Sequence, residues 1–192
     1  MFYAPDLFAF TQVFETHWSQ IRQEYEGLGS GIVDIHRNGT HADFIESHRQ
    51  HGSVENGWAP SWQAGSSDKN YDWLTYGIGF RGRFPSEAAE KFPLTQALLS
   101  RFPCITVAAF SMMKPLSCIA AHTHPRLGGN LLTFHLGIDV APRSSYLNVN
   151  GVFEEERERK SIVFDGSAEH FAINVGQRNR TILYLEFDTS RL

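Results

Sequence analysis

The sequence predicts a mainly β protein with flanking helices, in which two antiparallel sheets form a jelly-roll barrel. Short apolar runs separated by turn residues fill the second half of the 192-residue chain, and no helical segments alternate with them. This pattern is typical of antiparallel double sheets and disfavours a parallel α/β sheet. Helical periodicity is confined to the first half, where it predicts elements that cover a sheet.

A chain of 192 residues is long enough for one domain with a sizeable core. We expect a single domain, 1–192, with a helical cover over 1–100 and a jelly-roll core over 101–192. The net charge of −4 gives no basic field for nucleic acid or an anionic membrane. Without a signal-peptide pattern or a long apolar run, the sequence predicts a cytoplasmic protein. Cys104 and Cys118 lie in apolar runs and are expected to be reduced, buried thiols.

The first helical segment is expected over residues 6–26, with Asp6 as its cap. Its apolar side chains recur at helical spacing: Phe10, Phe14, Trp18, Ile21 and Tyr25. A later helical region begins at Ser86, is interrupted at Pro93 and resumes over 94–102. Both regions are expected to cover a sheet.

Between these helices the chain is polar. Thr40 and Asp43 resemble a capping box that opens a short helix ending near Gln50. Four histidines lie in or beside this helix: His36, His41, His48 and His51. A solvated helical surface is the simpler interpretation, and a metal site or a pocket lid is the functional alternative. Residues 53–70 are rich in Gly, Ser and Asn and predict a loop.

Strand candidates follow from alternation and from β-branched or aromatic content. Asn150-Gly151 is a strong hairpin signal between two of them. The candidates are 73–80, 105–113, 118–121, 130–140, 145–149, 161–164, 170–173 and 181–187.

The segment 111–139 holds three of the nine histidines: His122, His124 and His135. Imidazole is the commonest metal ligand among side chains. The pair His122-Thr-His124 has the spacing of two ligands on one face of a strand, because alternate residues point the same way. Hydrogen-bonded core histidines are the alternative interpretation.

Alternation divides the last strands into two faces. His135 and Thr133 share one face of 130–140 and predict the polar wall of a cavity, while the opposite face is uniformly apolar. Arg180 begins a strand whose other residues are mostly apolar. It is either an ordinary exposed strand end or a bidentate partner for a carboxylate. His170 begins the strand after an Asp-Gly turn, so histidines and an arginine on neighbouring strands can converge inside a barrel.

Four motifs follow one another in the second half of the chain, and Arg180 with an apolar strand comes after them. The motifs are FSMMKP (110–115), AHTHP (121–125), FHLGI (134–138) and FDGSAEH (164–170). In these motifs the chain resembles the aspartyl/asparaginyl β-hydroxylase family of Fe(II)- and 2-oxoglutarate-dependent dioxygenases. The resemblance covers about the C-terminal two-thirds of the chain and implies an iron site in a cupin-like, double-stranded β-helix.

Carried over by position, the resemblance implies a role for five residues. His122 and His170 match the iron ligands. Arg180 matches the arginine that pairs with the distal carboxylate of 2-oxoglutarate, and His135 and Ser111 match positions that hydrogen-bond the same cosubstrate. The implied cofactor set is Fe(II), 2-oxoglutarate and O₂.

The chain departs from the family pattern in three places. Thr133 stands where the family carries an arginine, and the loop 125–130 is slightly longer, so the contacts to a cosubstrate or substrate carboxylate are expected to differ. His124 stands where the family has a glycine and other oxygenases of this class have a carboxylate. It is either a third iron ligand or a residue that points toward substrate or a nearby carboxylate.

The expected reaction is hydroxylation of an unactivated C–H bond in a small amino acid or short peptide, with release of succinate and CO₂. An acyl chain or another small molecule is the alternative substrate. Arg126 is a candidate to hold a substrate carboxylate, as are Arg81 and Arg83, although solvated arginines are the simpler interpretation. A metal enzyme that needs no 2-oxoglutarate and an inactive metal- or ligand-binding barrel are the rival hypotheses.

Overall fold

The computed structural model describes residues 1–33, 57–62, 68–80 and 86–192. The helix expected over 40–50, the cluster from His36 to His51, and Arg81 and Arg83 all lie outside these described residues. No helix in the described part of the chain is both long enough and apolar enough to cross a membrane.

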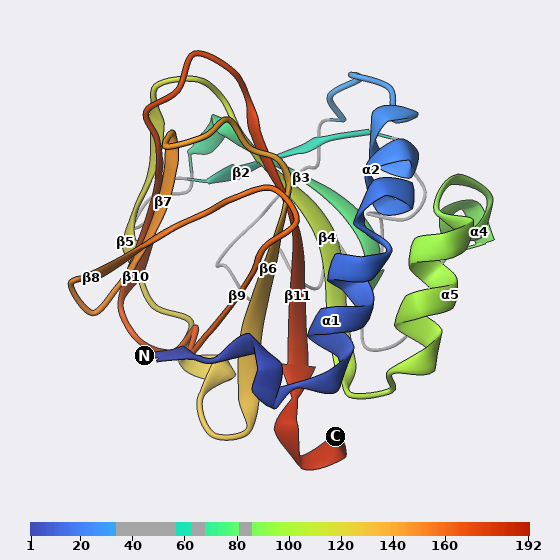
Figure 1. Ribbon diagram of the computed structural model, residues 1–192. Coiled ribbons are helices and arrows are strands. Elements are labelled where there is room, and N and C mark those ends of the chain that lie inside the picture. Colours follow the sequence, from blue (N-terminus) through green and yellow to red (C-terminus); the bar gives the residue numbers. More distant parts are fainter. Residues whose placement is uncertain (34–56, 63–67, 81–85) are drawn as a thin grey trace.

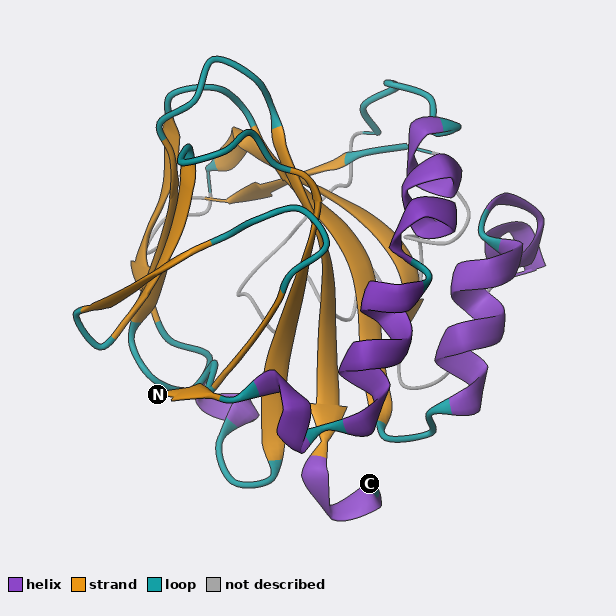
Figure 2. Cartoon of the chain, in the orientation of Figure 1, coloured by secondary structure: helices purple, strands orange, loops and turns teal. Residues whose placement is uncertain are grey.

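The described strands form two antiparallel sheets that face each other (Figures 1 and 2). The larger sheet has the order β1 (Phe2–Tyr3), β9 (Ser161–Phe164), β6 (Leu131–Asp139), β11 (Arg180–Asp188), β4 (Ile105–Met113), β3 (Lys69–Phe80) and β2 (Ala59–Trp62). The smaller sheet has the order β5 (Ser117–His122), β10 (His170–Asn174), β7 (Ser145–Val149) and β8 (Val152–Glu155). This arrangement is a double-stranded β-helix, which confirms the predicted fold class.

Helices cover the outer face of the larger sheet (Figure 1). They are α1 (Ala9–Thr16), α2 (Trp18–Glu26), α4 (Ser86–Lys91) and α5 (Pro93–Arg101), with short 3₁₀ turns η1 (Pro5–Leu7), η2 (Pro125–Leu127) and η3 (Thr189–Arg191). The prediction of a single helix over 6–26 is wrong in detail, because the helix is interrupted at His17, between α1 and α2. Its Nδ1 lies 2.8 Å from the carbonyl oxygen of Val13, to which its backbone N–H also donates. Asp6 lies within η1 and does not cap α1, which begins after Phe8.

Two apolar clusters lie on opposite faces of the larger sheet. The first packs α1, α2 and α5 against its outer face and includes the fully buried rings of Phe10, Phe14, Phe134 and Phe187. The second lies between the two sheets and contains Met113, Ile119, Leu147, Val149, Ile162, Phe164 and Ala172. Because the helices bury the outer face, the inner face of the larger sheet is left for the interior of the barrel.

The strand bounds predicted for 105–113, 145–149 and 161–164 are confirmed. So is the Asn150-Gly151 hairpin, in which both residues have positive φ, 50° and 82°, as a tight two-residue turn requires. The loop predicted over 53–70 is wrong in part, because β2 lies within it and pairs with β3. The first hundred residues also contribute β1, β2 and β3 to the larger sheet.

The cysteines differ from each other in exposure. Cys104 is buried, as predicted, whereas Cys118 is exposed, so the prediction of two buried thiols is wrong for the second. Cys118 lies on β5 next to Ile119, which faces the barrel. Neighbouring residues of a strand point to opposite faces, and the Cys118 side chain therefore points to solvent.

Candidate metal centre

Two of the histidines lie side by side on neighbouring strands of the smaller sheet. His122, the last residue of β5, is paired with His170, the first residue of β10, and their ring centroids lie 4.4 Å apart. The register of this strand pair shifts between His170 and Ala172, so three residues of β5 span two of β10. This irregularity turns both Ile119 and His122 toward the barrel, although an odd spacing in a regular strand would place them on opposite faces.

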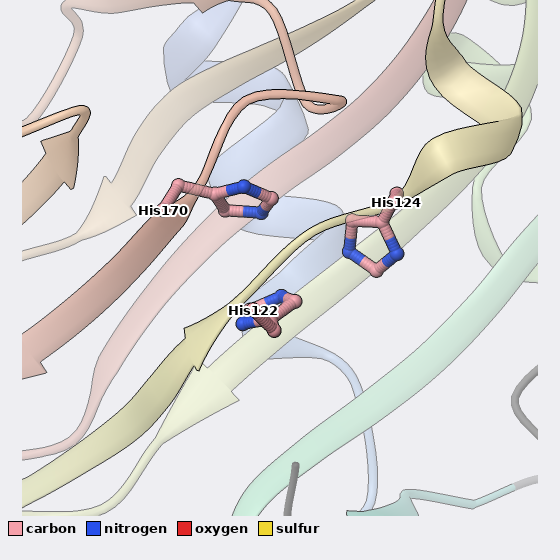
Figure 3. Close-up of side chains that lie close together, drawn as sticks. All are labelled: His122, His124 and His170. Atoms are coloured by element: carbon pink, nitrogen blue, oxygen red, sulfur yellow. The ribbon is translucent and has the colours of Figure 1, made fainter. Parts of the chain in front are cut away.

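The side chain of His124 lies close to the rings of His122 and His170, although this residue is outside β5. β5 ends at His122, and His124 precedes the short turn η2, so the two do not share a strand face as the spacing predicted. Its backbone N–H donates to the carbonyl of Gly166 at 3.1 Å, which ties this segment to the loop before β10. The His124 ring centroid lies 4.8 Å from that of His122 and 5.3 Å from that of His170 (Figure 3).

The three imidazoles present one metal-ligating nitrogen each within 4.8 Å of one another. Small rotations of the rings bring such nitrogens within the roughly 2.1 Å reach of one metal ion. In Figure 3 the rings converge from β10, from the end of β5 and from the segment that follows it. The geometry therefore fits a three-histidine metal site.

Backbone carbonyls fix the orientation of two of the rings. Nδ1 of His122 lies 2.7 Å from the carbonyl oxygen of Ala120, and Nδ1 of His170 lies 2.8 Å from that of Ala168. A carbonyl only accepts, so each Nδ1 carries the hydrogen and each neutral ring keeps its lone pair on Nε2. Such hydrogen bonds fix the tautomer of metal-binding histidines.

The electrostatic surroundings keep these rings neutral. Burial lowers the pKa of His122, and burial together with the neighbouring His122 lowers the pKa of His170 to about 4. Neutral imidazole is the form that ligates a metal. Near neutral pH, the two rings are therefore ready to bind a cation.

Aromatic side chains flank the histidines. The Trp73 ring lies 6.2 Å from that of His122, and its Nε1 donates to Ser111 Oγ at 3.0 Å. The Phe164 ring lies 5.3 Å from His170 and 5.0 Å from His135. Phe164 thus joins the histidine cluster to the polar wall on which Ser111 and His135 lie.

The polar wall is the inner face of the larger sheet. Strand pairing places His135 opposite Tyr184, and Thr133 opposite Glu186, so these side chains share the face that alternation predicted. Arg180 lies on the same face of β11 and is 1% exposed. The exposed strand-end interpretation of Arg180 is therefore wrong, and its guanidinium instead binds a carboxylate of the same chain, that of Glu156.

Sequence reasoning did not single out Glu156. It lies in the run EEERERK (154–160), whose composition is typical of a solvated surface, yet its side chain is 2% exposed. It binds Arg180 through both carboxylate oxygens, accepts from Ser145 Oγ at 2.6 Å and lies 3.0 Å from His135 Nδ1. No local signal separates it from its charged neighbours, because only the path of the chain between the sheets buries it.

A second buried carboxylate lies further along β11. Glu186 accepts both guanidinium hydrogen bonds of Arg126, at 2.7 and 2.9 Å, and one from Tyr184 Oη at 2.8 Å. Arg126 is therefore held by the protein itself, in contrast to the expectation that it grips a substrate carboxylate. Thr133 is buried on the adjacent strand, 1% exposed, close to Gly166.

Two curated proteins resemble part of the chain. A protein of Rhizobium tropici described as ornithine lipid ester-linked acyl 2-hydroxylase is 29% identical over 117 residues, which cover 60% of this chain and 41% of the relative. Uncharacterized protein L888 of Acanthamoeba polyphaga mimivirus is 23% identical over 137 residues, covering 69% of this chain and 49% of the relative. The chain thus spans less than half the length of either relative.

Solved structures with a similar fold share little sequence. A predicted oxalate decarboxylase of Thermotoga maritima superposes with a TM-score of 0.45 at 12% identity, over 71% of this chain and 96% of that one. KdgF of a Halomonas species gives 0.42 at 10%, over 67% and 86% of the two chains. The family model for aspartyl/asparaginyl β-hydroxylase matches residues 15–189, nearly the whole chain. The chain therefore belongs to the aspartyl/asparaginyl β-hydroxylase family.

Proposed function

We propose that the chain is an Fe(II)-dependent hydroxylase whose iron is held by His122, His124 and His170. The observation that supports this most strongly is the convergence of three imidazoles, two of them with Nδ1 committed to a backbone carbonyl. Imidazole suits several transition metals, including zinc, copper and iron. Fe(II) is the metal that the family resemblance implies.

A bound Fe(II) supplies the activation of O₂ that insertion of oxygen into an unactivated C–H bond requires. The protein's own task is to fix the ligands and to exclude water. The carbonyls of Ala120 and Ala168 hold the His122 and His170 rings, and Trp73 and Phe164 flank them with apolar surface. No acid–base pair is needed for this chemistry.

Hydroxylation by O₂ needs a co-reactant that gives up two electrons, and we propose a 2-oxo acid. The C–H substrate, O₂ and the 2-oxo acid become the alcohol, CO₂ and a carboxylate one carbon shorter. With 2-oxoglutarate, the cosubstrate that the resemblance implies, that carboxylate is succinate. An iron ion held by His122, His124 and His170 would have coordination positions left for the 2-oxo group and the adjacent carboxylate.

The distal carboxylate of 2-oxoglutarate fits less well. Arg180, which the resemblance assigns to it, already binds Glu156 in a bidentate ion pair. The proposed reaction therefore does not depend on a contact between Arg180 and the cosubstrate. It needs only the 2-oxo group and the adjacent carboxylate.

The substrate class is proposed as a small amino acid or short peptide, with an acyl chain as the second candidate. Arg126 offers little to a substrate carboxylate while Glu186 holds it. The acyl candidate is favoured by the relative described as an acyl 2-hydroxylase. The side chains packed between the two sheets are apolar, as contacts to an acyl chain require.

Anaerobic reconstitution with Fe(II) and a 2-oxo acid, either 2-oxoglutarate or 2-oxopentanoate, followed by O₂ uptake with panels of amino acids, short peptides and acyl compounds, tests the proposal. We expect one iron per chain and substrate-stimulated O₂ uptake, both lost in His122→Ala and His170→Ala. His17→Ala is the matched control, because His17 lies on the helical layer and its ring is hydrogen-bonded to the carbonyl oxygen of Val13. Undiminished uptake in the His170 variant would sink the assignment.

A further inference from the structure

The interior of the barrel contains an anion site that the protein itself fills. Among the residues whose burial the structure describes, Arg180 is the one fully buried lysine or arginine. Its Nε donates to Oε2 of Glu156 at 2.7 Å and its Nη2 donates to Oε1. Ser145 Oγ donates to Oε2 of Glu156 at 2.6 Å, and His135 Nδ1 lies 3.0 Å from Oε1. Every carboxylate oxygen of Glu156 thus has two partners.

The charges of this cluster balance. Burial alone would raise the pKa of Glu156, but the Arg180 guanidinium and the His135 bond hold it well below its ordinary value, so the carboxylate is ionised. Burial lowers the pKa of His135, which is therefore neutral near pH 7 and donates its Nδ1–H. One cation and one anion remain, and a second anion finds no unmatched positive charge at Arg180.

Glu156 is part of the scaffold. It opens the segment 156–160, by which the chain crosses from β8 in the smaller sheet to β9 in the larger one (Figure 1). Its backbone N–H donates to Ser145 O at 3.0 Å, and Arg159 N–H donates to Gly137 O at 3.0 Å. A Cβ on Gly137 would overlap the carbonyl of Arg157, so the segment lies directly on β6. These contacts hold the Glu156 side chain in place against Arg180.

The cluster lies next to the metal centre. His135 contacts the Phe164 ring, which in turn contacts His170, with centroid distances of 5.0 and 5.3 Å. The side chains packed around Phe164 are apolar and include Ile162 and Leu147. A 2-oxo acid bound at the three histidines would thus extend its tail past apolar side chains toward a guanidinium that is already neutralised.

From this we infer that Glu156 determines cosubstrate specificity. It supplies the carboxylate that Arg180 binds, and so excludes a 2-oxo acid with a second carboxylate in favour of one with an uncharged tail. Two carboxylates on one guanidinium would repel each other strongly in a desolvated site. Displacing Glu156 would also forfeit its bonds to Ser145 and His135. This inference rests on the proposed 2-oxo acid chemistry and names its cosubstrate class.

The matched probes are 2-oxoglutarate and 2-oxopentanoate, which differ only in the terminal carboxylate. Binding to the anaerobic Fe(II) protein is followed by the charge-transfer absorbance of the 2-oxo acid chelate. We expect the unsubstituted protein to bind 2-oxopentanoate at least tenfold more tightly than 2-oxoglutarate. Glu156→Ala frees Arg180 and should reverse this preference. Glu154→Gln, which alters an exposed neighbouring carboxylate, should leave this preference unchanged.

A metal-free arm separates this inference from the proposed function. Glutarate, which cannot chelate through a 2-oxo group, should bind metal-free Glu156→Ala and not the unsubstituted chain, as measured by calorimetry. The double variant Glu156→Ala/Arg180→Met removes both charges and should fold, because no charge is left unpaired. It should not bind glutarate, because the guanidinium is gone. If Glu156→Ala does not fold, Glu156→Gln replaces it in both binding experiments, because it removes the charge and keeps the side-chain volume.

The outcomes are distinct. Tight 2-oxoglutarate binding by the unsubstituted protein, or an unchanged preference in the Glu156 variants, overturns the inference while iron binding stands. Iron binding with no absorbance from either 2-oxo acid in any variant also overturns it. Failure of the chain to bind iron, with glutarate binding gained in Glu156→Ala, overturns the proposed function and leaves the anion site of Glu156 and Arg180 intact.

Discussion

His122 and His170 are directly opposed residues of neighbouring strands, and their rings lie 4.4 Å apart at the end of the smaller sheet. Each ring is fixed by a carbonyl two residues earlier in its own segment. His124, in contrast, lies on the connection after β5, just before η2. Two of the three candidate ligands therefore belong to strands of the smaller sheet, and the third belongs to a connection.

This difference predicts unequal losses of metal affinity. We expect His122→Ala and His170→Ala each to weaken Fe(II) binding by at least a hundredfold, because each removes a strand-fixed ligand. His124→Ala should weaken it by about tenfold, because this residue lies on a connection and not on a paired strand. Competition with a chelator under anaerobic conditions measures all three. An affinity unaffected by His124→Ala would show that this ring points to substrate and does not ligate iron.

The Glu156 cluster predicts an acid-sensitive contribution to stability. The folded-state pKa of Glu156 lies below its ordinary value of 4.5, so the folded protein binds this proton less readily than the unfolded chain. The stabilisation is therefore fully present above about pH 4.5 and is lost as the pH falls below it. Urea unfolding of Glu156→Gln should show a deficit of about 3 kcal/mol at pH 7 that shrinks toward pH 3. A deficit independent of pH would contradict this.

The pair of Arg126 and Glu186 predicts a structural role for an arginine that could have held substrate. Glu186 is buried, and the bond between them raises the pKa of Arg126 despite the opposing effect of burial. Arg126→Met leaves a buried carboxylate uncompensated and should cost about 3 kcal/mol of unfolding free energy. The double variant with Glu186→Gln should recover much of that loss.

Arg178→Met is the control for this pair. The side chain of Arg178 is 65% exposed and bonds to Asp139 at the surface, so its removal should cost less than about 1 kcal/mol. Equal losses in the two arginine variants would mean that the Arg126 pair contributes no more than a surface contact. Chemical denaturation at pH 7 distinguishes these outcomes.

Gly137 predicts a further weak point beside the candidate site. A Cβ at this position would overlap the carbonyl of Arg157, so Gly137→Ala must push the segment 156–160 away from β6. We expect a loss of about 2 kcal/mol, in the range found for overpacked positions. Gly29→Ala is the control, because its added Cβ would meet no atom within 4 Å. Thermal unfolding of both variants decides whether this close approach matters.

The sequence by itself determined most strands of the second half of the chain and the two faces of β6. Alternation over 130–140 placed Thr133 and His135 on the inner face, because a strand has a side-chain period of two and one face must be apolar where helices cover it. The Asn150-Gly151 turn was equally local, since only such residues adopt positive φ at low cost. These features depend on residues that are close together in the sequence, so the sequence alone is enough to predict them.

The tertiary structure alone decided the partners of the inward-facing side chains. The irregular register of β5 and β10 turns His122 toward the barrel, and the path of 156–160 across the sheets buries Glu156 against Arg180. The sequence shows Glu156 within a run of charges that resembles solvated surface. Burial and pairing depend on segments 24 residues and more apart, as Glu156 and Arg180 are, and no local pattern encodes which of several glutamates meets the guanidinium.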